Sequence, residues 1–137
     1  LYRLAGSPDP GEKAPFTDVS ANAAYADAVT WAYNAGVVNG KNQFSFAPDA
    51  SITREQITAM FWRYANNTAK ADMTPDNNLK AYTDAGKLSA YAVDCMRWAV
   101  GAGLINGTSN TLLTPQGTAT RAQVAAMVER IANYVKW

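Results

Sequence analysis

The sequence Thr53-Arg54-Glu55-Gln56 returns 67 positions later as Thr120-Arg121-Ala122-Gln123. Each copy fits the start of a helix, because an N-cap threonine hydroxyl accepts from the backbone N–H three residues on, and the Gln there reaches back to the N-cap amide. Apolar residues then recur at the spacing of a helix with one buried side. They are Ile57, Met60, Phe61, Tyr64 and Ala65 in the first copy, and Val124, Met127, Val128, Ile131 and Ala132 in the second.

The arginine in each copy is not explained by the helix start. Arg54 and Arg121 would lie in the first helical turn, at the positive end of the helix dipole, where an acid is favoured. An exposed arginine without a role is tolerated there at a cost of a few tenths of a kcal/mol. Because the residue recurs at a fixed period, we expect it to have a function.

The surrounding sequence repeats as well. Residues 16–18, Phe-Thr-Asp, match residues 82–84, Tyr-Thr-Asp, at an offset of 66; from Asp27 and Asp94 onward the offset is 67, so the second copy has gained one residue. Other matched pairs are Trp31 and Trp98, Gly36 and Gly103, Asn39 and Asn106, Gly40 and Gly107, Pro48 and Pro115, and Arg63 and Arg130.

This period predicts how the chain is organised. Residues 1–15 are expected to be the tail of a preceding repeat plus a linker. A first complete repeat covers 16–66, a polar linker covers 67–81, and a second complete repeat covers 82–137. Because the chain begins in mid-pattern at Leu1, we expect it to be a piece of something longer.

Each repeat is expected to contain two helices joined by a loop. The first helix should cover about 23–35, or 88–102 in the second repeat, and end at Gly36 or Gly103 in the left-handed conformation. One helix pair cannot bury its own apolar stripe, so the repeats should pack around a shared axis in an all-α fold.

The loops begin with turns at Asn39-Gly40 and Asn106-Gly107. We expect Gly40 and Gly107 to adopt positive φ, although a missing side chain also lets a ligand approach the backbone. The apolar loop residues should pack into the core. They are Phe44 and Phe46 in the first repeat and Leu112 and Leu113 in the second.

Composition excludes several function classes. Twelve Lys and Arg balance eleven Asp and Glu, for a net charge of +1, which is too little for the basic face of a nucleic-acid binder. The absence of His removes the commonest general base and zinc ligand, and no metal or cofactor is expected. Cys95 is read as a small buried residue. No apolar run reaches the roughly 20 residues that span a bilayer.

These motifs together resemble tandem S-layer homology (SLH) repeats. The resemblance rests on the Phe16-Thr17-Asp18-Val19 opening, the Trp31-Ala32 helix, residues 36–40 (Gly-Val-Val-Asn-Gly), Pro48, and Ile52-Thr53-Arg54, all repeated in the second unit. It covers nearly the whole chain. Gln56 and Gln123 depart from the family's Thr-Arg-Ala-Glu signature, which more often ends in Glu; the capping box survives this change.

The resemblance implies a non-catalytic module that anchors exported proteins to the cell wall of Gram-positive-type bacteria. Family members bind a secondary cell-wall polysaccharide, often bearing ketal-linked pyruvate, in grooves between repeats. They usually form a pseudo-threefold spindle of three repeats. Only two repeats are complete here, so the body is expected to be incomplete, or completed by a missing repeat or by self-association.

The candidate polysaccharide-binding residues follow from this implied ligand. Arg54 and Arg121 could offer a guanidinium fork and nearby helix-start amides to a pyruvyl carboxylate. Removing both guanidinium groups should then abolish retention on wall material and leave the fold nearly intact. The remaining candidates are Thr53, Thr120, Trp31, Trp98, Asp18, Asp84, Gly40 and Gly107.

Structural roles compete with several of these assignments. Trp31 and Trp98 could provide flat surfaces for sugar rings, but a tryptophan at helical spacing is more often a core residue. Asp18 and Asp84 could accept from sugar hydroxyls, or they could cap the segment entering the first helix.

Two other functions stay open. The chief alternative is a protein–protein assembly module, in which the same helical faces contact another chain. An enzyme is a distant third possibility. Paired carboxylates hydrolyse glycosides, but Asp18 and Asp84 match one another across repeats and do not form a pair within one unit.

Overall fold

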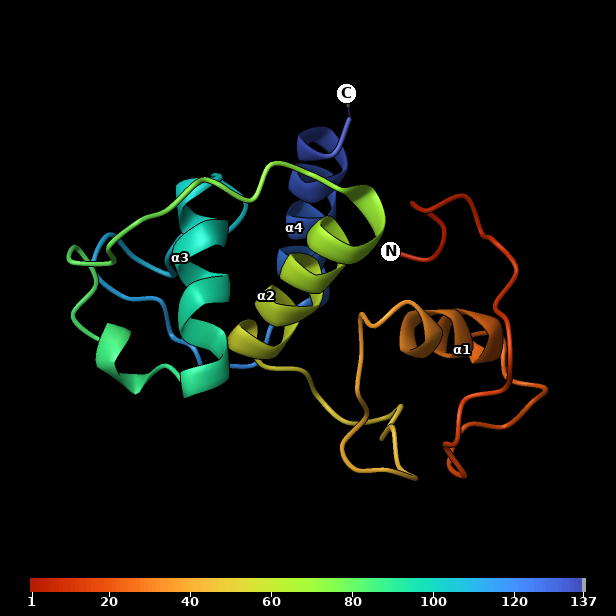
Figure 1. Cartoon of the computed structure of the whole chain (residues 1–137). Coiled ribbons are helices and arrows are strands. Elements are labelled where there is room, and N and C mark those ends of the chain that lie inside the picture. Colours follow the sequence, from red (N-terminus) through yellow and green to blue (C-terminus); the bar gives the residue numbers. More distant parts are fainter. Residues whose placement is uncertain (137) are drawn as a thin grey trace.

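The chain is described here by a computed structural model covering residues 1–136, so the expected end of the second repeat at residue 137 lies outside the described residues. The four α-helices of this part of the chain are α1 (Ala26–Asn34), α2 (Arg54–Arg63), α3 (Val93–Gly101) and α4 (Arg121–Tyr134) (Figure 1). A π-helical turn, η1 (Tyr64–Ala69), continues α2. Short 3-10 helices, η2 (Ala85–Lys87) and η3 (Ala90–Ala92), precede α3.

The expected all-α class is confirmed. Between residues 1 and 136 the chain forms no strand, and its β-type pairing is limited to two isolated bridges, Asn42 with Ser45 and Thr53 with Thr118. We call residues 16–66 repeat 1 and residues 82–136 repeat 2. None of the helices in the described part of the chain is long and apolar enough to cross a membrane.

Both predicted capping boxes are present. At α2, the Gln56 backbone N–H donates to Thr53 Oγ1 over 3.2 Å, and the Thr53 N–H donates to Gln56 Oε1 over 2.9 Å. At α4, the same two bonds join Thr120 and Gln123, each at 3.1 Å. The repeated Thr and Gln therefore define where the second helix of each repeat begins.

The first helix of each repeat is shorter than predicted. α1 begins at Ala26 and α3 at Val93, whereas the apolar pattern predicted starts near 23 and 88. Neither preceding residue, Tyr25 or Ala92, makes a side-chain cap, and the segment before α3 forms the 3-10 helices η2 and η3 in place of earlier α-helical turns. The predicted ends are confirmed, since Gly36 and Gly103 have φ of +70° and +72°.

The two turn glycines differ. Gly40 has φ of +80°, as predicted. For Gly107 the prediction of positive φ is wrong, because this glycine is absent from the positive-φ residues and is needed for space instead. A Cβ at Gly107 would lie 2.5 Å from the Leu112 carbonyl oxygen and 2.8 Å from the Tyr82 ring.

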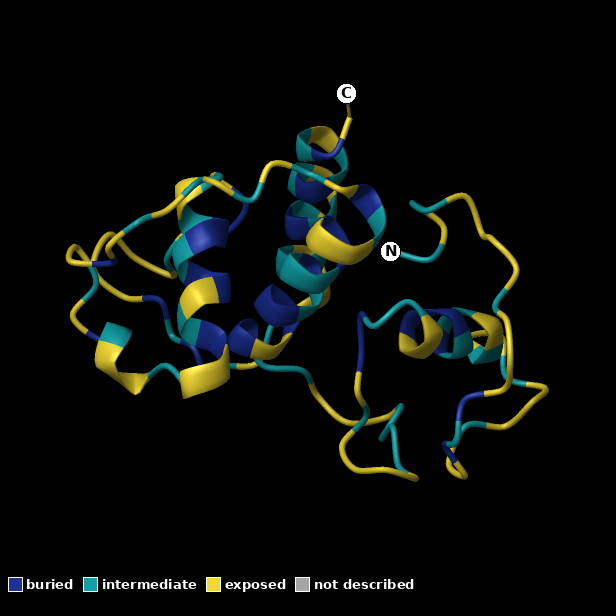
Figure 2. Ribbon diagram, in the orientation of Figure 1, coloured by how far each residue is buried: buried dark blue, intermediate teal, exposed yellow. Residues whose placement is uncertain are grey.

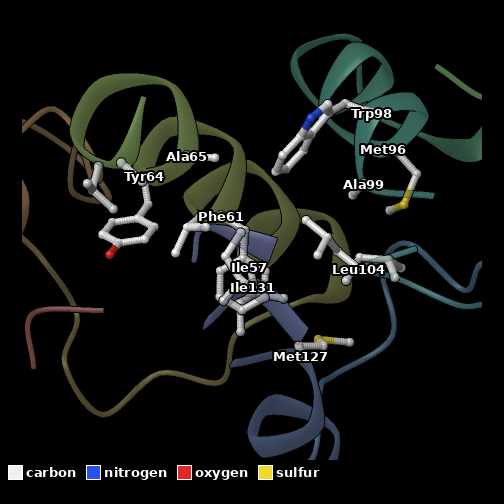
Figure 3. Packing of buried hydrophobic residues seen from close by; sticks show 14 of the residues in the cluster. Ile57, Phe61, Tyr64, Ala65, Met96, Trp98, Ala99, Leu104, Met127 and Ile131 are labelled. Atoms are coloured by element: carbon white, nitrogen blue, oxygen red, sulfur yellow. The ribbon is translucent and has the colours of Figure 1, made fainter. Parts of the chain in front are cut away.

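A continuous apolar core joins the two repeats (Figure 2). Side chains from α2, α3 and α4 point toward one another in Figure 3, where Phe61, Ile57 and Ile131 lie close to Met127 and Leu104. Ile131 and Leu104 are exposed by no more than 1%. The second helices of both repeats thus share one core, in line with the expected packing of neighbouring units.

The apolar loop residues split into two groups. Leu113 is fully buried and Phe46 is half-buried against the core. The prediction is wrong for Phe44 and Leu112, which are 55% and 41% exposed. In each loop the apolar residue that packs inward, Phe46 or Leu113, lies two positions after a carbonyl bound by the repeat's opening segment. Thr17 N–H donates to Phe44 O and Thr83 N–H donates to Thr111 O, both at 2.9 Å.

The polar segment between the repeats is tied to repeat 2. The Asp72 carbonyl oxygen accepts from Trp98 Nε1 at 3.1 Å and from the Tyr134 hydroxyl at 2.6 Å. Further along, Arg97 pairs with Asp76 through two hydrogen bonds of 2.7 and 2.8 Å. The linker therefore lies across α3 and reaches the end of α4.

Residues 1–6 form turns that pack on repeat 1. The Ala5 N–H donates to Leu1 O at 2.9 Å, a helical i to i−4 bond. The Tyr2 ring lies 5.6 Å from the Trp31 ring, between centroids. This segment forms helical turns that pack against α1 through Trp31.

Candidate functional site

The start of α2 docks onto the loop of repeat 2. The first-turn amides of Arg54 and Glu55 donate to Gly117 O at 2.9 Å and Pro115 O at 3.0 Å. The next amide donates to the Thr53 hydroxyl, as described above. Because these N–H groups already have protein acceptors, the start of α2 has no free amide to offer an anion.

The Arg54 side chain is part of the same contact. It is 4% exposed, and it donates from Nε to Leu113 O at 2.8 Å and from Nη2 to Asn106 O at 2.7 Å. Burial lowers the pKa of the guanidinium and the nearby Asp84 carboxylate opposes this shift. The group stays charged, because arginine is not deprotonated in proteins. Arg54 therefore holds two loop carbonyls of repeat 2.

Asp18 and Asp84, at the start of each repeat, bind the loop of their own repeat. Asp84, which is 8% exposed, accepts from the backbone N–H groups of Leu113 at 2.9 Å and Thr114 at 2.8 Å. Asp18 accepts in the same way from Phe46 and Ala47, at 2.9 and 2.8 Å. Neither carboxylate caps the first helix, so the capping role considered for them is wrong.

These hydrogen bonds set the protonation of both carboxyls. Burial alone would raise the pKa of Asp84, but the Leu113 and Thr114 amides outweigh it and the pKa is lowered from its ordinary value. The Phe46 and Ala47 amides lower the pKa of the exposed Asp18 carboxyl. Since Leu113 N–H binds Asp84 while Leu113 O binds Arg54, one loop residue joins the two charged groups.

The two tryptophans lie in the core. Trp31 and Trp98 are 6% and 3% exposed. Trp31 packs against Tyr2 and Tyr64, and Trp98 packs edge-on against Tyr134 at 5.8 Å. This is the core alternative considered for them from the sequence, and their rings do not present a broad face to solvent.

The start of α4 is open where that of α2 is closed. Arg121 and Ala122 are exposed. Within residues 1–136, neither of their backbone N–H groups has a protein acceptor. The same sequence motif thus occupies two environments: Arg54 is held by repeat 2, while Arg121 faces solvent with two helix-start amides beside it.

A trough of about 760 Å³ runs along the outer face of α2. Repeat 1 supplies its loop on one side, with Gly40 and Lys41, and repeat 2 supplies Tyr91, which is 50% exposed. Arg63 and Lys41 bring two cations to the trough, and no Asp or Glu lines it. Arg63 also donates to Val37 O at 3.4 Å.

Sequence reasoning missed the role of Glu55. Its carboxylate is 5% exposed and accepts from the N–H and hydroxyl of Ser89, at 3.0 and 2.6 Å. The Tyr91 hydroxyl and Gln116 Nε2 also donate to it, at 3.4 and 3.3 Å. The available signal was the difference between Glu55 and Ala122, the one position at which the two Thr-Arg motifs differ.

Within the described residues, no group of three or more His, Cys, Asp and Glu side chains could hold a metal ion. What the geometry offers is a cationic trough in repeat 1, bordered by Tyr91 of repeat 2, and an exposed helix start with an arginine.

Comparison with known proteins identifies the repeats. The model of the S-layer homology domain matches residues 15–58 and 81–125. The chain belongs to the S-layer homology family. SLH domains anchor surface proteins to the cell wall and bind cell-wall polysaccharide, and this membership places the chain at the cell surface, in association with the wall.

Several relatives share the SLH region. The chain is 32% identical over 130 residues to an amylopullulanase of Thermoanaerobacterium thermosulfurigenes, covering 93% of this chain and 7% of that protein. It is 32% identical over 117 residues to an endoglucanase of Bacillus sp. (strain KSM-635), covering 85% of this chain and 12% of that protein. A surface-layer 125 kDa protein of Lysinibacillus sphaericus is 26% identical over 123 residues, covering 88% and 10%. The chain thus spans a small part of each relative's length.

The two motif arginines are expected to differ in their effect on stability. Arg54→Ala should lower the free energy of unfolding by about 2–4 kcal/mol, because two buried carbonyls lose charged donors. Arg121→Ala, at an exposed position, should change it by no more than about 0.5 kcal/mol. This replaces the sequence-based expectation that both substitutions spare the fold. Urea denaturation of the two variants checks it, and equal midpoints would contradict the buried role of Arg54.

The lowered pKa of Asp84 predicts acid sensitivity. A carboxyl whose pKa is lower in the folded state contributes stability above its ordinary value of 3.8, and that contribution is lost as pH falls through the folded-state pKa. Asp84→Asn should therefore be less stable than wild type at pH 7 and lose less stability between pH 5 and 2. Thermal denaturation across this range measures it. The control is Asp94→Asn, an exposed carboxyl without a side-chain hydrogen bond in the described structure.

Proposed function

We propose that this chain anchors a surface protein by binding an anionic secondary cell-wall polysaccharide, one carrying ketal-linked pyruvate, without catalysing a reaction on it. In this proposal residues 16–66 and 82–137 act as two SLH units. The observation that carries the proposal is the trough between the loop of repeat 1 and α2, bordered by Tyr91 of repeat 2, with two cations and, among the described residues, no acid in its lining.

The trough suits an acidic sugar chain in two ways. Lys41 and Arg63 provide positive charge for a carboxylate, and a guanidinium can bind it through two parallel hydrogen bonds. The space left by the missing side chain of Gly40 is filled by the Phe16 ring, so this glycine serves the turn. The exposed ring of Tyr91 offers an apolar face with a polar edge, which suits the C–H face of a sugar.

The start of α4 supports a second contact point. Arg121 and the free amides of Arg121 and Ala122 form an exposed positive end of a 14-residue helix. Such ends favour carboxylate and phosphate groups. Two weak contacts along one polymer raise the overall affinity by about 10² to 10⁴ without new interactions.

The buried candidates take a supporting role in this proposal. Arg54, Asp84, Trp31 and Trp98 shape the loops and the core on which the trough is built, and Thr53 caps α2. Of the ten residues proposed from the sequence, we assign direct contact with the ligand to Arg121 and Thr120, which are both exposed.

A second candidate function, assembly with another SLH unit, is favoured by one observation. Residues Asn39, Phe46, Pro48, Ala50 and Ile52 line the trough, and they are the repeat counterparts of Asn106, Leu113, Pro115, Gly117 and Ala119, which hold the start of α2. The Thr-Arg helix start of another unit fits this surface in the same manner, so self-association through Arg121 of another copy is the competing proposal.

Retention on wall material tests the main proposal. Arg121→Ala and Lys41→Ala should each weaken binding to purified sacculi at least about tenfold, because each removes a charged contact worth roughly 1.5–3 kcal/mol. Binding should be lost when the sacculi lack pyruvylation. Arg130→Ala, which removes the same charge from the same helix, is the matched control. Undiminished binding of both folded variants would refute these contacts.

Sedimentation velocity distinguishes self-association from polysaccharide binding. If the trough takes another copy, wild type should form larger species as its concentration rises, and Arg121→Ala should stay at one chain. A chain that remains monomeric at every concentration, yet binds sacculi, contradicts assembly and supports polysaccharide binding.

A further inference from the structure

The Glu55 carboxylate is buried between the two repeats and surrounded by neutral donors. Four hydrogen bonds reach it from repeat 2, two from Ser89 and one each from Tyr91 and Gln116. Within residues 1–136, no lysine or arginine nitrogen lies within 4.0 Å of it, since the ion pairing there is confined to Arg97 and Asp76. The charge is therefore stabilised by hydrogen bonds from repeat 2 and not by a countercharge.

The internal repeat shows what the other units would present at this position. The counterpart of Glu55 at the start of α4 is Ala122, which has no charge. The counterpart of Gln116, at the same offset of 67, is Asp49, an exposed acid in the loop of repeat 1. Repeat 2 thus offers an amide donor where repeat 1 offers a carboxylate.

We propose that Glu55 is the residue that determines which SLH unit can lie next to repeat 1. A helix start reading Thr-Arg-Glu fits repeat 2, because Ser89, Tyr91 and the loop residue Gln116 all donate to the acid. The same start placed on a loop like that of repeat 1 would bring Glu55 against the carboxylate of Asp49. A second carboxylate in the place of the Gln116 amide would remove a donor to the buried Glu55 and add a like charge beside it, so this pairing is disfavoured.

The converse pairing follows from the same chemistry. A start reading Thr-Arg-Ala, as at Arg121, carries no acid and is compatible with Asp49 in the facing loop. The surface of repeat 1 around Asp49 therefore fits the start of a unit of the α4 type and disfavours one of the α2 type. In this proposal the residue at position 55 or 122 of the helix start and the residue at position 116 or 49 of the facing loop favour one order of units over another, whether or not the trough binds polysaccharide.

The decisive experiment converts the loop of repeat 2 to the repeat 1 type. Gln116→Asp should lower the melting temperature of the chain by roughly 4 °C or more, because an acid then faces Glu55. Glu55→Gln combined with Gln116→Asp should recover a large part of that loss, since the amide and the acid have only exchanged places. The Gln116 bond to Lys87 O, 2.7 Å long, is lost in both variants and cancels in the comparison.

Two further variants complete the cycle. Glu55→Gln alone is the remaining member of the double-mutant cycle. Asp49→Gln is the control: it makes an acid-to-amide change in the loop of repeat 1, away from Glu55, and should leave the melting temperature unchanged. A double variant that melts no higher than Gln116→Asp overturns the proposal. If Gln116→Asp does not fold, folding of the double variant supports the proposal, and failure of both to fold contradicts it.

Discussion

The structure depends on a buried arginine that binds backbone carbonyls of a neighbouring repeat. The loop of repeat 2 contains carbonyls that would be left without donors in the interface, at Asn106 and Leu113. Arg54 supplies the donors, and the charge that this buries is offset by two short hydrogen bonds and by the nearby Asp84. Together with the backbone bonds from Arg54 and Glu55, this contact holds the start of α2 against the repeat 2 loop, next to the core that the two repeats share.

The same motif serves two purposes in one chain. In repeat 1 the amides and the guanidinium of the Thr-Arg motif donate hydrogen bonds to repeat 2. In repeat 2 the corresponding groups of Arg121 and Ala122 face solvent. A cation at the start of a helix is unfavourable for the isolated helix. At Arg54 the loop carbonyls compensate for this, which gives the residue a structural explanation, while at the exposed Arg121 the described part of the chain provides no such acceptor.

Much of the fold could be predicted from local sequence. Thr53, Gln56 and their counterparts specify the second helices, because a capping box is a contact within four residues. Gly36 and Gly103 mark the ends of the first helices for a similarly local reason. The internal repeat then extends each local prediction to a second place in the chain, and it exposed the one position, Glu55 against Ala122, at which the motif varies.

What could not be predicted depends on contacts between distant segments. The burial of Arg54 requires knowing that residues 106–117 lie over the start of α2, and no periodicity gives that information. The same is true of Asp18 and Asp84, whose partners lie 28 to 30 residues further on. Gly107 looked like a turn glycine because Asn-Gly usually is one, yet the space it leaves is set by the Tyr82 ring and the Leu112 carbonyl.

The linker has a mechanical consequence for an anchoring module. The carbonyl oxygen of Asp72 receives the indole N–H of Trp98 and the hydroxyl of Tyr134, so a single peptide group of the linker is fastened to the first and the last helix of repeat 2. Tension along the backbone between the repeats would load the Trp98 and Tyr134 hydrogen bonds in parallel, so both would have to break before the linker could lengthen. Under load the linker is therefore held against repeat 2 and does not act as a flexible connection.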